Sequence, residues 1–219
     1  MSGAGWNLKE GEINSSIEFE HAITNFFSKK NRMNNLYKLL LFQAILNIEN
    51  RVNKDVFYEV AIEFAELYFE CKKNYELNMT IYNGRSKKSA VDILIQNLFK
   101  KNIQNYKTIS EQDKIDYIYS IKEVLKTNVV GALYKSLNEV PYSFNIKLEK
   151  LELNNDFKNF LDSNKGILEN LIFYRMVEFF KISEKDEKIL EKEMEKNNIL
   201  NYKEDFYLEI QEEIKMLLK

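Results

Sequence analysis

One proline and six glycines are all that this chain of 219 residues contains, and this scarcity limits its fold more than any other feature. Sandwich and barrel folds need many tight turns, and tight turns draw heavily on glycine and proline. The chain is therefore expected to be mainly helical. With 45% apolar residues it also has enough hydrophobic side chains for a substantial core, so we predict a multi-helix bundle.

Apolar residues recur with the 3.6-residue period of an α-helix along most of the sequence. A capping pattern at Ser110 and Asp113 marks one helix start, and Gly131 is expected to interrupt or kink the helix that follows. Helices are predicted over residues 16–30, 36–48, 53–71 and 90–99, from 111 onward, and over 157–161 and 167–180.

The period changes around Pro141, where apolar and polar residues begin to alternate. Phe144, Ile146 and Leu148 are followed by Leu151 and Leu153, each separated from the next by a polar residue or a turn. Alternation of this kind is typical of strands that bury one face. The sequence therefore predicts one short β-hairpin at about 142–154, and this is the one β element we expect.

Charge divides the chain into regions although the total is only −2. Residues 72–107 carry a net charge of +6, whereas residues 183–219 carry −4 and have the spacing of two amphipathic helices. We therefore expect a helical domain over 1–182, which includes the small hairpin, and an acidic two-helix appendage over 183–219.

The sequence predicts a cytoplasmic protein. Cys71 is the single cysteine, so no internal disulfide can form, which fits a reducing compartment. No apolar run approaches the roughly 20 residues of a membrane-spanning helix, and the first residues do not resemble a signal peptide. We expect no membrane partner.

Residues for catalysis are scarce. His21 and Cys71 are the only histidine and cysteine, and each is more typical of a packed or surface residue than of a catalytic group. A stripe of carboxylates follows one helix face but lacks the Glu-x-x-His pairs of a di-metal centre, and no glycine-rich phosphate loop is present. The stripe consists of Glu59, Glu63, Glu66 and Glu70. We expect no enzyme, no metal, no cofactor and no small-molecule substrate.

The basic region is the strongest positive signal for a ligand. It places cations and free backbone N–H groups near a turn before a helix, where phosphates could be contacted. The candidate nucleic-acid-binding residues are Arg85, Lys87, Lys88, Lys100 and Lys101. The alternative is that these cations only solvate helix faces, and the presence of a single arginine among them favours that alternative.

Several stretches resemble the helical N-terminal region of bacterial HNH-type endonucleases from restriction and phage-defence loci. The similarity lies in Asn35–Leu46, Gly131–Tyr134, Pro141–Phe144, Leu151–Leu153 and Ile167–Phe180, in that order along the chain. In that family a nuclease domain with paired histidines follows, whereas here an acidic segment without histidine follows. The resemblance therefore implies the accessory region without the catalytic one.

Two functional hypotheses follow. The first is a non-catalytic helical binding module, a subunit or regulator of a nuclease or nucleic-acid complex in bacterial phage defence. It implies a protein partner, and nucleic acid is a further candidate ligand. The alternative is a phage-encoded inhibitor, similar in role to anti-CRISPR proteins, that blocks a host nuclease complex.

Overall fold

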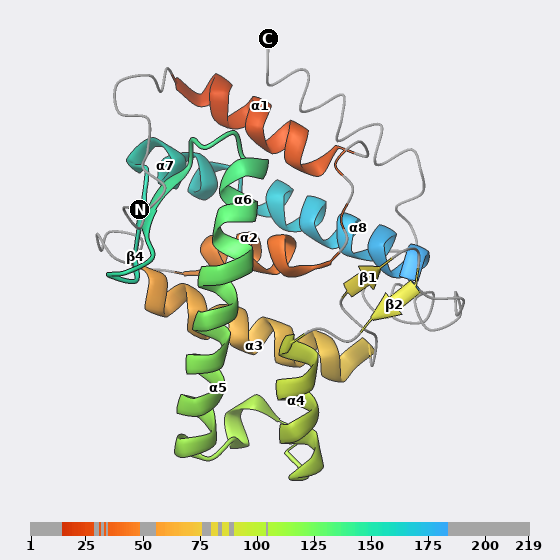
Figure 1. Cartoon of the computed structure of the whole chain (residues 1–219). Coiled ribbons are helices and arrows are strands. Elements are labelled where there is room, and N and C mark those ends of the chain that lie inside the picture. Colours follow the sequence, from red (N-terminus) through yellow and green to blue (C-terminus); the bar gives the residue numbers. More distant parts are fainter. Residues whose placement is uncertain are drawn as a thin grey trace.

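The structure is a computed structural model that describes residues 15–28, 31, 33, 35–48, 56–75, 80–82, 85–87, 90–103 and 105–183. Helices dominate these residues, which confirms the mainly helical class (Figure 1). Apart from Ser183, the predicted appendage at 183–219 lies outside them. The helices are α1 (Ser15–Phe27), α2 (Tyr37–Asn47), α3 (Phe57–Tyr75), α4 (Ala90–Lys100), α5 (Glu111–Val124), α6 (Val130–Ser136), α7 (Asn155–Ser163) and α8 (Lys165–Ser183).

The helix α2 is the centre of the bundle. Its sequence is apolar around most of its circumference, and eight of its side chains are buried, so it can pack on several sides at once. It contacts α3, α6 and α8, and α1 lies against α6, α7 and α8. Aromatic rings fill the space between α1, α2 and α7, with Phe42 of α2 lying 5.6 Å from Phe26 and 6.5 Å from Phe157 between ring centroids.

The helices α5 and α6 form one long rod that crosses α3 and α2 (Figure 1). The Ser110 hydroxyl accepts a hydrogen bond from the backbone N–H of Asp113, as the capping pattern predicts. A π-helical turn, Leu125–Val129, joins the two helices, and Gly131 lies inside α6. The predicted interruption at Gly131 was therefore wrong by a few residues. It occurs where the Thr127 hydroxyl donates to the carbonyl of Glu123, a side-chain bond that competes with regular helix.

The predicted hairpin is confirmed as β3 (Tyr142–Asn145) paired with β4 (Lys150–Leu153) in antiparallel register. Tyr142 faces Leu153 and Phe144 faces Leu151, and all four side chains are buried. The alternation of the sequence thus corresponds to one buried face, while Leu148, in the turn between the strands, is exposed.

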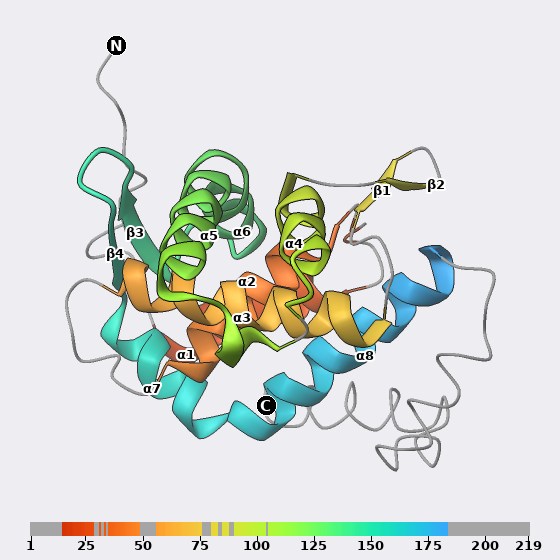
Figure 2. The same ribbon diagram turned by 90° about the horizontal axis from the view of Figure 1, so that it is seen from below.

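A second antiparallel hairpin, β1 (Thr80–Tyr82) with β2 (Arg85–Lys87), is added by the structure. Asn83-Gly84, a pair of residue types that favours a turn, lies outside the described residues. Strands of three residues are too short to give an alternation signal, which is why the sequence did not predict them. The two hairpins lie at opposite sides of the molecule in both ribbon views (Figures 1 and 2).

The turn of the β3–β4 hairpin is attached to the α5–α6 rod by ion pairs. Glu149 accepts from Lys126 at 2.7 Å and also pairs with Lys122. Hydrogen bonds from these two ammonium groups hold the pKa of the Glu149 carboxyl below its usual value. The ionised carboxylate therefore stabilises the folded state.

Glu149→Gln should consequently make stability less dependent on pH. A carboxyl that is more acidic when folded stabilises the protein above its unfolded pKa, and this contribution disappears as pH falls through the folded pKa. We expect the variant to be less stable than the wild type at pH 7, and the difference to shrink as the pH falls below 4.5, the usual pKa of the group, and through its lower folded pKa. Urea unfolding across this range measures the difference. Glu152→Gln, on the exposed face of β4, is the control, and a difference between Glu149→Gln and wild type that does not shrink as the pH falls would contradict the prediction.

Candidate functional site

The four candidate nucleic-acid-binding residues that the structure describes fall into two groups at opposite ends of α4. Arg85 and Lys87 belong to β2, before the helix begins, and Lys88 lies outside the described residues. Lys100 is the last residue of α4, and Lys101 follows it. A helix of this length spans about 16 Å at 1.5 Å per residue, so the structure does not bring the four described residues into one compact cluster.

Only one of the two lysines at the end of α4 is free of a described ion pair. Lys101 pairs with Asp113 in the first turn of α5, and this hydrogen bond, together with one from Ser110, lowers the pKa of the Asp113 carboxyl. Lys100 is exposed, and so is Lys107 a few residues later. A phosphate that binds Lys101 would have to compete with Asp113.

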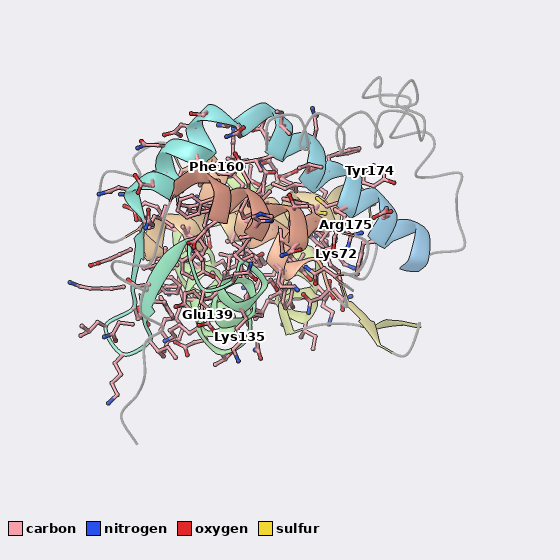
Figure 3. All side chains as sticks on the ribbon, turned by 90° about the horizontal axis from the view of Figure 1, so that it is seen from above. Lys72, Lys135, Glu139, Phe160, Tyr174 and Arg175 are labelled. Carbon is pink, nitrogen blue, oxygen red and sulfur yellow. The ribbon has the colours of Figure 1, made fainter. Side chains whose placement is uncertain are left out.

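Lys72 contributes to the basic region in sequence but not to the surface. Its residue is 5% exposed, and its Nζ lies 3.5 Å from the carboxylate of Asp92, which is fully buried. Tyr68 donates a hydrogen bond to the same carboxylate at 3.2 Å. Figure 3 shows Lys72 among the packed side chains of the interior. The group joins α3 to α4, so this cation is part of the core.

The other candidate groups of the sequence behave as packed or surface residues. Cys71 is buried, and burial raises the pKa of its thiol, which makes the reactive thiolate less accessible. His21 is exposed on α1. Of the carboxylate stripe on α3, Glu59 is exposed and the other three members are half-buried. Within the described residues, no group of three or more His, Cys, Asp or Glu side chains could hold a metal ion.

The helix α5 presents apolar side chains to solvent. Its buried side is formed by Tyr117, Ile118 and Ile121, so Ile115 and Tyr119 are turned outward and are 54% and 63% exposed. Ile115 shares the apolar period of Ile118 and Ile121, yet it lies outside the buried side of the helix. The apolar period of α5 alone could not show that the buried side of the helix is centred near Tyr117 rather than near Ile115.

A third exposed side chain, from α3, borders this part of α5. Tyr58 is 56% exposed, and its ring centroid lies 5.9 Å from the Nζ of Lys122. Lys122 follows Tyr119 by one helical turn, and residues three apart are neighbours on a helix surface. The two tyrosines therefore flank the same lysine. We call the set formed by Tyr58, Glu59, Ile115, Asp116 and Tyr119 the α3–α5 surface.

Among the residues that the structure describes on and beside the α3–α5 surface, exposed carboxylates outnumber exposed cations. Glu59, Asp116 and Glu111 are exposed, whereas Lys122 is half-buried and already paired with Glu149. Burial, together with the negative charges of Glu66 and Glu63 on α3, raises the pKa of the Tyr106 phenol. The exposed charges described on and beside this surface, those of Glu59, Glu111 and Asp116, are therefore negative.

Comparison of the chain with models of known protein families, with curated protein sequences and with solved structures finds no match. In the part of the chain that the structure describes, no helix is both long enough and apolar enough to cross a membrane.

Proposed function

We propose that the protein is a non-catalytic helical binding module, a subunit or regulator of a nuclease or nucleic-acid complex in bacterial phage defence. The observation that carries the proposal is the exposure of Ile115 and Tyr119 on one stripe of α5 and of Tyr58 on α3, the helix packed against it. Single exposed apolar residues are common, but apolar and aromatic side chains gathered on one face are typical of protein interfaces. The assignment to phage defence rests on the resemblance to HNH-type endonucleases.

Purification of the tagged chain at native expression from its host tests the proposal. We expect a partner at a fixed molar ratio after size-exclusion chromatography, identified by mass spectrometry as a nuclease, an ATPase or another nucleic-acid-processing protein. Recovery of the chain alone, or cleavage of DNA or RNA by the purified chain that a point substitution abolishes, would contradict the proposal.

Nucleic acid is proposed as a second ligand, through the basic residues on either side of α4. Each phosphate neutralised by a cation contributes about −0.7 to −0.9 to the slope of log K against log salt concentration, so five contacts predict a slope of about −4. Removing two contacts with Lys87→Gln and Lys88→Gln should flatten the slope by about 1.5 to 2, similarly for all sequences. Fluorescence anisotropy with single- and double-stranded probes measures it.

Lys135→Gln on α6 is the matched control for this experiment, because Lys135 is exposed but lies outside the basic region. Lys101→Gln should have a smaller effect than Lys100→Gln, since Lys101 is held by Asp113. If binding is undetectable at low salt, or if the double variant leaves the slope unchanged, these cations are solvated surface residues that do not bind nucleic acid.

A further inference from the structure

We propose that the α3–α5 surface binds a basic, amphipathic segment of the protein partner, so that the partner supplies lysine or arginine side chains beside apolar ones. This inference rests on the proposed function and adds the chemistry of the partner to it. It follows from three properties of the surface. The surface exposes apolar side chains, which we call its apolar anchors; it carries exposed carboxylates; and the lysines of α5 beside it already interact with other groups.

The apolar anchors are arranged for a contact that spans two helices. Ile115 and Tyr119 are four residues apart on α5 and therefore lie on one stripe, and Tyr58 of α3 borders the same stripe across Lys122. Tyrosine contributes large contact area at a low cost in side-chain entropy, and it is enriched among the residues that dominate binding energy. A partner that buries these three side chains must itself present apolar groups.

The charges beside these apolar side chains determine which charge the partner segment must carry. Glu59 follows Tyr58 directly, Asp116 follows Ile115, and Glu111 lies one turn before Ile115, so every apolar anchor has an exposed carboxylate near it or on the next turn. The two lysines of α5 are engaged: Lys122 pairs with Glu149, and the Nζ of Lys114 lies 4.7 Å from the ring centroid of Tyr106. An acidic partner would meet repulsion here, whereas a basic one would meet complementary charge.

The first test uses the full chain and two short helical peptides of identical length, one built from leucine and lysine and one from leucine and glutamate. We expect the basic peptide to bind and the acidic one not to bind, as measured by fluorescence anisotropy. Tyr119→Ala should weaken the binding of the basic peptide about tenfold or more. Charge reversal by Glu59→Lys with Asp116→Lys should weaken it by at least about tenfold and reduce its salt dependence.

Matched controls separate the surface from general charge. Ile93→Ala removes an exposed apolar side chain of α4, and Glu152→Lys reverses an exposed charge on β4; both should bind the basic peptide as the wild type does. Equal binding of both peptides, or an equal loss of affinity in Glu152→Lys and in the double charge reversal, would overturn the inference. So would a dimer of the chain that Tyr119→Ala converts to monomer, because the occupant would then be a second copy.

The second test uses the partner recovered with the native protein, which keeps this inference separate from the proposed function. Tyr119→Ala and the double charge reversal should release that partner, while Glu152→Lys should retain it. Retention in all variants would overturn the inference and leave the binding function intact. Tighter retention by the charge-reversed variant would also overturn it, since the partner would then be acidic. Failure to recover any partner counts against the proposed function. In that case the peptide experiment still tests whether the α3–α5 surface binds a basic segment.

Discussion

Replacing Asp92 by alanine is expected to lower the free energy of unfolding by about 3–5 kcal/mol, because it removes the carboxylate that compensates a buried ammonium group. Asp92 is fully buried, with the Nζ of Lys72 at 3.5 Å and the hydroxyl of Tyr68 at 3.2 Å. In the variant the ammonium group of Lys72 is still buried away from water, but the attraction of the Asp92 carboxylate that offset this cost is lost. Urea denaturation at pH 7 measures the change.

Two further variants identify the cause of this loss. Asp116→Ala is the control, since Asp116 is an exposed aspartate on α5 and should change stability by no more than about 0.5 kcal/mol. Asp92→Leu combined with Lys72→Met should recover much of the stability lost in Asp92→Ala, because replacing both members of a buried pair by apolar groups removes the desolvation cost as well. If the double variant is no more stable than Asp92→Ala, the pair is not the cause.

Phe42→Ala is expected to destabilise the protein by about 3–5 kcal/mol, since it deletes a fully buried ring at the centre of the bundle and leaves a cavity. The ring centroid of Phe42 lies 5.6 Å from that of Phe26, 5.7 Å from that of Phe27 and 6.5 Å from that of Phe157, so three aromatic side chains would lose a packing partner or shift. The change is measured by thermal and urea unfolding monitored by circular dichroism.

The matched control for Phe42→Ala is Tyr119→Ala, which truncates an aromatic side chain that is 63% exposed. It should change the free energy of unfolding by no more than about 0.5 kcal/mol. The two variants thus separate stability from binding: the first should unfold more easily, and the second should remain folded while losing its partner. Comparable destabilisation by both would mean that Tyr119 is packed rather than available to a partner.

The helical class and most helix positions follow from local properties of the sequence. Scarce proline and glycine, a 3.6-residue apolar period and the cap at Ser110 act within one or two helical turns, so they can be recognised without tertiary contacts. The β3–β4 hairpin is local in the same way, because the alternation that ends in Leu151 and Leu153 corresponds to one buried face. The β1–β2 hairpin is too short for such a signal.

The candidate site depended on contacts between residues distant in sequence. Lys72 and Lys100 are equally charged lysines of one basic region, yet the first is buried against Asp92 and the second is exposed. Ile115 and Ile118 share an apolar pattern, yet only Ile118 is buried. In each case the outcome depends on which neighbouring helix covers that side of the residue's own helix, and a periodic pattern does not contain this information.

The sequence by itself determined that this protein is a helical bundle with a buried α2, a hairpin after Pro141 and few groups for catalysis. Only the tertiary structure decided which charges are compensated and which apolar side chains stay in contact with water. Tyr58 lies beside Lys122, one turn after Tyr119, because α3 packs against α5. Helix propensity and hydrophobic period arise from interactions along one chain segment, whereas burial and ion pairing arise from the crossing of segments, which the sequence encodes only through the whole fold.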